Sequence, residues 1–238
     1  MRTIEAMRSD DLSTAVTSLS RAEKIWVVGF GDNYPLAHFA RAQLIKVKPD
    51  IRMIPLGGFS VPEEFASIRG SDSVLALAIG RRTRMLRSIL QSARLADAKT
   101  ISVTDLASAG GTELADVTLR CRTSGLTYFD SLASPVSLIT YLCMAVADRL
   151  GQNAVDRLRY IDSIHSDWGE PGSHRFKCAV LNYSKCKKRV KTEKAGFSFA
   201  FFLTCVNRRP RFFSGGVTHR IKQTKRIGWP PERISGAE

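Results

Sequence analysis

Five short runs of apolar and β-branched residues recur in the first half of the chain, and several of them stop at a glycine or a proline. A short apolar run bounded in this way is typical of a strand that is buried on both faces. We therefore expect strands over residues 24–28, 51–54, 74–79, 100–104 and 117–121.

Around these runs, apolar residues recur every three or four positions, which is the period of an amphipathic helix. Ser9, followed by two acids, resembles a helix N-cap. Asp32 or Asn33 is expected to cap the helix after the first strand, and Pro49 to end it. Residues 132–150 are apolar over more than one stripe, which predicts burial in the core or against another subunit. Helices are expected over residues 12–19, 62–68, 132–150 and 155–165. A further helix is expected after residue 33, with one apolar stripe made of Leu36, Phe39, Ala40, Leu44 and Val47. Another is expected after residue 83, with one apolar face made of Leu86, Ile89, Leu90 and Ala93.

This alternation of strands and helices predicts an α/β fold in which helices cover both faces of a parallel sheet. Sheets of this kind bind ligands at the carboxyl ends of their strands, where the strand order reverses. Two loops are candidates on that ground, residues 29–33 and residues 80–84, because each joins a predicted buried strand to the start of a helix.

The first loop reads Gly29-Phe30-Gly31-Asp32-Asn33. Its glycines let the backbone approach a ligand closely, and the free N–H groups of a helix start favour an anion. A dinucleotide fingerprint would need a third glycine where Tyr34 stands and an acid at the end of the second strand, which instead ends in Ile54. The dinucleotide hypothesis therefore fails, and an anion site and a simple tight turn remain as alternatives.

The second loop reads Gly80-Arg81-Arg82-Thr83-Arg84. Three arginines and a hydroxyl at the positive end of a helix are typical of a phosphate cradle. The alternative is that these arginines only face solvent.

Positive charge is concentrated near the carboxyl end. The 238 residues include 36 lysines and arginines and 22 acids, a formal net charge of +14. Residues 171–238 hold 16 of the basic residues and 3 of the acids, so residues 1–170 carry a net charge of only +1. We expect a nearly neutral body, 1–170, and an irregular basic tail, 171–238, that is either disordered or non-native. The tail is interpreted as an out-of-frame extension or as an arm that binds nucleic acid.

Other features limit the alternatives further. No apolar run opens the chain, and the longest apolar-leaning stretch, 195–206, is shorter than the roughly 20 residues of a membrane-spanning helix, so we expect a cytoplasmic protein. Cys121 and Cys143 lie in apolar segments, where buried free thiols are expected. A zinc site made from tail cysteines with His174 or His219 matches no finger spacing, so no metal is expected.

The order of these features resembles the sugar isomerase (SIS) domain, in the version carried by the MurR/RpiR family of bacterial transcription regulators. The likeness runs from about residue 1 to about residue 168. The matching stretches are 25–31, 73–79 with the arginine-rich loop behind it, 101–105, 114–117 and 128–135.

The resemblance implies a three-layer αβα sandwich with a five-stranded parallel sheet, usually dimeric, that binds a phosphorylated sugar. In the regulators this sugar is an effector and not a substrate. The phosphate-side hydroxyls of the family would fall on Asn33, Ala78, Gly80 and Thr83. Of these positions only Thr83 keeps a hydroxyl, although Asn33 can still form hydrogen bonds. Arg81 and Arg84 match arginines that RpiR-type members carry.

These features together predict a sugar-phosphate sensor domain, homodimeric, without catalysis, cofactor or membrane partner. The resemblance starts at the first residues, so we expect no helix-turn-helix domain in this chain. DNA would then be bound only through such a domain supplied elsewhere or through the basic tail. The predicted ligand-binding residues are Gly29, Gly31, Asp32, Asn33, Glu63, Gly80, Arg81, Arg82, Thr83 and Arg84.

The main alternative function is sugar-phosphate isomerisation. That reaction needs a general base, and the histidines considered are His38 and His165. Neither histidine has an acidic residue near it in the sequence at a spacing typical of a catalytic pair. Glu63 follows the second strand, where it is expected to meet sugar hydroxyls or to lie on a solvated helix face.

Overall fold

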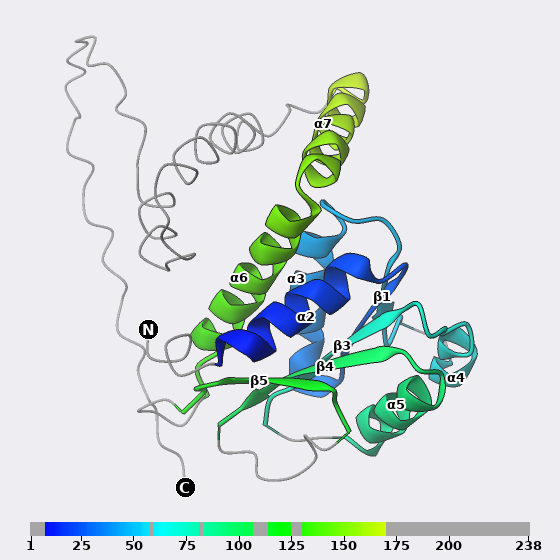
Figure 1. Cartoon of the computed structure of the whole chain (residues 1–238), viewed down its shortest axis with the longest axis vertical. Helices are drawn as coiled ribbons and strands as arrows, with labels where there is room; N and C mark the ends of the chain where they lie inside the picture. Colours follow the sequence, from blue (N-terminus) through cyan, green and yellow to red (C-terminus); the bar gives the residue numbers. More distant parts are fainter. Residues whose placement is uncertain (1–7, 58–59, 81–82, 107–113, 125–129, 170–238) are drawn as a thin grey trace, which may run out of the picture. The chain divides into compact units, whose positions relative to one another are not determined.

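A computed structural model describes residues 8–57, 60–80, 83–106, 114–124 and 130–169 (Figure 1). Five parallel strands form one sheet, as expected. The strands are β1 (Ile25–Gly29), β2 (Ile51–Ile54), β3 (Ser73–Ala78), β4 (Lys99–Asp105) and β5 (Val117–Cys121). The helices are α2 (Ser9–Arg21), the single turn η1 (Gly31–Asn33), α3 (Tyr34–Leu44), α4 (Val61–Phe65), α5 (Arg84–Leu95), α6 (Ala133–Leu150) and α7 (Gln152–Asp167). The expected tail, 171–238, lies outside the described residues, and so do Arg81 and Arg82.

The strand order is β2-β1-β3-β4-β5. β1 lies between β2 and β3, because Val28 pairs with Ile54 on one side and with Ala76 on the other. The chain therefore moves from β1 outward to β2 and then returns to the opposite side of β1. In this sheet order the strand sequence reverses between β1 and β3, which is where such folds bind ligands. The loops after these two strands consequently lie side by side at the carboxyl edge of the sheet.

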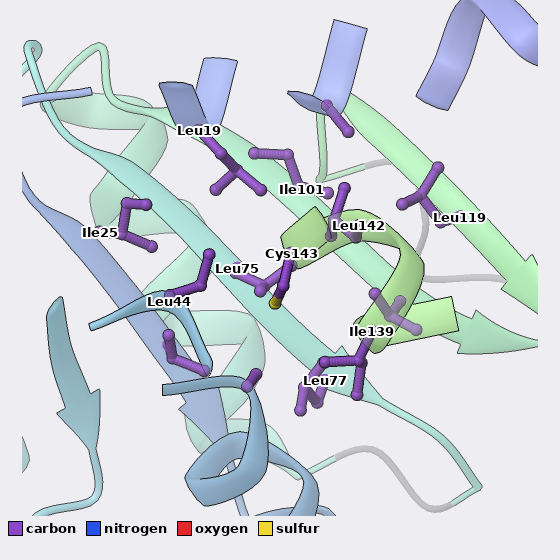
Figure 2. Packing of buried hydrophobic residues seen from close by; sticks show 14 of the residues in the cluster. Leu19, Ile25, Leu44, Leu75, Leu77, Ile101, Leu119, Ile139, Leu142 and Cys143 are labelled. Atoms are coloured by element: carbon purple, nitrogen blue, oxygen red, sulfur yellow. The ribbon is translucent and has the colours of Figure 1, made fainter. Parts of the chain in front are cut away.

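Helices cover both faces of the sheet, so the expected three-layer αβα architecture is confirmed (Figure 1). Side chains of α2, α3 and α6 pack with alternate residues of the strands in the larger core. Figure 2 shows Leu19, Leu44 and Leu142 from these helices in the same buried cluster as Leu75 and Leu77 of β3. α4 and α5 cover the opposite face, where Phe65 of α4 lies edge-on to Trp26 of β1 with ring centroids 5.4 Å apart.

The expected buried stripes are largely confirmed. Leu86, Ile89, Leu90 and Ala93 are all buried under α5. α6 buries five apolar side chains and one proline on the sheet, which confirms the predicted place in the core for this helix. None of the helices in the described part of the chain has the length and apolar composition to cross a membrane.

Several helix ends differ from the expectation, among them the start of α2 and the end of α3. Ser9 is the first residue of α2, while Arg8 occupies the N-cap position and no side chain caps the helix. α3 ends at Leu44, before Pro49. Proline disfavours the helical conformation in the residue before it, and the chain closes a tight turn there through the N–H of Lys48, which donates to the Leu44 carbonyl over 2.9 Å.

Gly29 is expected to be irreplaceable for packing reasons. A Cβ at this position would lie 2.5 Å from the Asn33 carbonyl oxygen and 2.9 Å from the Ala37 Cβ, so α3 would have to move. Gly29→Ala should lower the free energy of unfolding by about 1–3 kcal/mol in urea denaturation followed by circular dichroism. Gly57→Ala, whose Cβ would meet nothing within 4 Å, is the matched control and should change it by less than about 0.5 kcal/mol. Equal stability of the two variants would contradict this close packing.

The buried thiols of Cys121 and Cys143 should be chemically inert in the folded chain. Burial raises the pKa of each to about 12, so both remain protonated at pH 8, where the thiolate is the reactive form. We expect iodoacetamide to leave both unmodified in buffer and to alkylate both in 8 M urea, as read by peptide mass mapping. Alkylation of either one in the native protein would show that these segments do not pack as described.

Candidate functional site

Asn33 joins the two candidate loops. Its Nδ2 donates a hydrogen bond to the Ile79 carbonyl over 3.0 Å, and its Oδ1 accepts one from the Ile79 N–H over 3.1 Å. The side chain is 5% exposed, so the pair is shielded from water. Asn33 occupies the N-cap position of α3, as one of the two expected residues, but its side chain makes no cap hydrogen bond because it crosses to the end of β3. The residue positions both loops, and its amide is not turned toward an incoming ligand.

The loop after β1 presents backbone donors. Gly31 has a φ of 57°, a left-handed conformation that favours glycine. The N–H of Asn33 donates to the Phe30 carbonyl over 3.1 Å. The N–H groups of Gly31 and Asp32 form no hydrogen bond with the described part of the chain, and both residues are exposed. Two donors are thus available to an anion, although the exposed Asp32 carboxylate lies among them.

The loop after β3 leads into α5 through Thr83. The Thr83 Oγ1 accepts a hydrogen bond from the Leu86 N–H over 3.2 Å, which makes this residue the N-cap of α5. A hydroxyl has one proton and two lone pairs, so this cap still leaves its O–H free to donate. Arg84 is exposed on the first turn of the helix. Thr83 can therefore cap α5 and donate a hydrogen bond to an anion at the same time.

A residue to which the sequence analysis gave no role supports the same loop. Asp105 ends β4, is buried, and accepts a hydrogen bond from the N–H of Gly80 over 3.4 Å. Gly80 has a φ of 69°, again in the left-handed region. The neighbouring Thr104 donates its hydroxyl to the Ala78 carbonyl over 3.1 Å. β4 therefore fixes the backbone of the loop, and the N–H of Gly80 is turned toward Asp105.

Glu63 lies on α4, at the start of which the Ser60 hydroxyl and the backbone N–H of Glu63 itself lower the pKa of its carboxyl group. The side chain is exposed, so it is ionised and open to solvent. Its neighbour Glu64 forms an ion pair with Arg52, with 3.9 Å between the charged atoms. The structure records no contact between Glu63 and the two loops within the described residues.

The two histidines considered for catalysis lie on helices. His38 is exposed on α3, and its ring lies 6.4 Å from that of Tyr34. His165 lies near the end of α7. Within the described residues, no group of three His, Cys, Asp or Glu side chains is arranged to hold a metal ion.

Replacing Asn33 should separate the loops and destabilise the chain. Asn33→Leu keeps the branched shape of the side chain but leaves the buried N–H and C=O of Ile79 without partners, at a cost of about 1–3 kcal/mol for each group. The free energy of unfolding should fall by more than about 1 kcal/mol in urea denaturation. Asp32→Leu at the exposed neighbour is the control and should have little effect. An Asn33→Leu variant as stable as the parent would show that this pair does not hold the loops.

Two solved structures of bacterial proteins share this fold. The sugar isomerase domain of an RpiR transcription factor from Sphaerobacter thermophilus is similar over 68% of this chain and 90% of that one, with 23% sequence identity and a TM-score of 0.63. The Vibrio vulnificus NanR protein, in complex with ManNAc-6P, is similar over 70% of this chain, with 17% identity and a TM-score of 0.56. This chain spans 64% of the NanR chain. At these identities the likeness concerns the fold.

A search of curated proteins found no significant match. The family model of the SIS domain, by contrast, matches residues 18–146, which is more than half of the chain. The matched range contains β1 to β5 and both loops of the candidate site. The chain belongs to the SIS domain family.

Proposed function

We propose that residues 1–170 bind a phosphorylated sugar as an effector and do not convert it, as the sensor domain of an RpiR-type transcription regulator. The observation that carries this proposal is the pair of hydrogen bonds between Asn33 and Ile79. These bonds hold together two loops that carry free N–H donors, at the edge of the sheet where the strand order reverses and such folds bind ligands. Membership of the SIS family and the fold shared with the RpiR transcription factor and with NanR support it. The homodimer and the cytoplasmic location expected from the sequence remain part of the proposal.

In this proposal the phosphate lies over the two loops. The N–H groups of Gly31 and Asp32 donate from one side, and the N–H and hydroxyl of Thr83 donate from the other. The start of α5 adds its positive dipole end, worth about 0.3–1 kcal/mol at an exposed site. The guanidinium group of Arg84 adds a charge-assisted contact, and the sequence places Arg81 and Arg82 in the same loop. Because the Asp32 carboxylate would repel the phosphate, it is assigned to the sugar hydroxyls.

We assign the site to an effector and not to a substrate. The buried carboxylate at the edge, Asp105, accepts a hydrogen bond from the N–H of Gly80, so it supports the backbone of the loop. Isomerisation would need a base within reach of the sugar, and Asp32 is the carboxylate that this proposal places there, so the assay for turnover below tests the effector role. DNA binding, in this proposal, is supplied by a helix-turn-helix domain elsewhere or by the basic residues of 171–238, which lie outside the described residues.

A phosphorylated sugar should stabilise the protein without being consumed. A ligand present at one hundred times its Kd stabilises the folded state by about 2.7 kcal/mol, so thermal unfolding of the full chain should move to higher temperature with a hexose 6-phosphate. The unphosphorylated hexose is the control and should have no effect. A coupled assay should detect no conversion between aldose and ketose phosphates. Turnover would favour the isomerase, and the absence of any shift across a panel of phosphosugars would contradict the proposal.

The role of Thr83 can be separated from its helix cap. Thr83→Ser keeps both the cap and the donor, so it should bind the same phosphosugar within about threefold of the parent chain. Thr83→Asp keeps an N-cap acceptor but brings a negative charge to the phosphate, so it should weaken binding at least tenfold, or about 1.4 kcal/mol, in calorimetry. Equal affinities of the two variants would remove Thr83 from the site.

A further inference from the structure

Positive charge in the nearly neutral body is concentrated on one helix, α5, and the loop before it. Residues 81–96 contain five arginines and no acid, a net charge of +5, whereas residues 1–170 together carry a net charge of only +1. Acids are common on other helices, since α2, α4, α6 and α7 each contain at least one. The charge of α5 is therefore not balanced within its own element.

Three of these arginines are exposed on α5 and share one side of it. Arg84, Arg87, Gln91 and Arg94 follow one another at intervals of three or four residues, which places neighbours on the same side of a helix. We call these four residues the α5 stripe. At a rise of 1.5 Å per residue the stripe is about 15 Å long.

The arginines of the α5 stripe form no ion pair and no side-chain hydrogen bond within the described part of the chain. Other arginines do have partners, because Arg41 and Arg157 donate to backbone carbonyls and Arg159 pairs with Asp156. Arg84 and Arg87 also line an open cleft of about 490 Å³ beside the helix. Their like charges lie one turn apart and repel each other, and an external anion would relieve that repulsion.

The chemistry of the stripe favours a polyanion that offers only phosphate groups. Guanidinium and amide groups are the donors that proteins commonly direct at nucleic-acid phosphates. A membrane is disfavoured, because the apolar face of α5 is buried in the core and cannot enter a bilayer. Residues 81–99 contain no aromatic side chain on which an unpaired base could stack, which disfavours single strands. A duplex, with one negative charge per roughly 1.7 Å, presents several phosphates along the stripe.

We propose that the α5 stripe binds the phosphate backbone of a nucleic-acid duplex. Arg84, Arg87 and Arg94 donate to phosphate oxygens, and the amide of Gln91 donates between them. No base edge is contacted, so the binding does not depend on sequence and weakens as the salt concentration rises. A phosphosugar held at Arg84 leaves Arg87 and Arg94 free, so this contact does not rest on the proposed function.

The test measures binding of the full chain to fluorescently labelled DNA and RNA duplexes of about 20 base pairs, by anisotropy at several salt concentrations. The chain should bind at least one of the two duplexes. A variant with both Arg87→Gln and Arg94→Gln should bind that duplex at least fivefold more weakly at about 100 mM salt. The slope of log K against log salt should fall in magnitude by about 2, because each phosphate contact contributes about 0.9.

The matched control carries both Arg21→Gln and Arg149→Gln. It removes the same charge from two exposed arginines of α2 and α6, the helices on the opposite face of the sheet. Residues 171–238 are unchanged in both variants, so binding through the basic tail contributes equally to each. The control should bind within about twofold of the parent chain, with the same salt slope. Glutamine forms helix about as well as arginine, so both variants should fold.

Four results would overturn the proposal. The parent chain could bind neither duplex, even at low salt. The α5 variant could bind like the parent, which would assign any duplex binding to another part of the chain. The two variants could lose equal affinity, which would leave net charge as the whole effect. The α5 variant could lose binding to vesicles containing phosphatidylglycerol and keep binding to the duplex, which would assign the stripe to a membrane surface. None of these results alters the tests of phosphosugar binding.

Discussion

The candidate site depends on one buried side chain, the amide of Asn33. The parallel strands β1 and β3 are neighbours in the sheet, where backbone hydrogen bonds join them. These bonds end where the strands end, so the loops beyond them need a separate interaction to stay together. Asn33 supplies it by pairing with both the N–H and the C=O of Ile79. An amide suits this position because it has a donor and an acceptor on one planar group. The bond pair fixes where the two sets of free N–H groups point.

β4 and Gly29 support the same arrangement from either side. Asp105 and Thr104 hold the backbone at Gly80 and Ala78, and the missing Cβ of Gly29 lets the start of α3 pack closely on β1. Thr83 combines the cap of α5 with a free hydroxyl proton. The edge of the sheet is thus a rigid frame for donors. Its charges are mixed, since Asp32 and Asp105 oppose the arginines of the second loop, so a ligand with both an anionic and a neutral polar end fits it best.

Much of the fold follows from the sequence, because buried parallel strands are continuous apolar runs. Residues 51–54 and 117–121 match β2 and β5 to the residue, and the loops after Val28 and Ile79 can be picked out from the glycines and helix starts that follow these strands. The role of Asn33 was not predictable, since an asparagine before a helix is normally its cap, and only the strand order shows that Ile79 is within reach.

The central claim is that two loops form one anion site, and nuclear magnetic resonance of the ¹⁵N-labelled chain tests it directly. During titration with a hexose 6-phosphate that binds the chain, the amide signals of Gly31, Asp32 and Thr83 should shift together and give a single Kd. Shifts confined to one loop, or different Kd values for the two loops, would contradict the account.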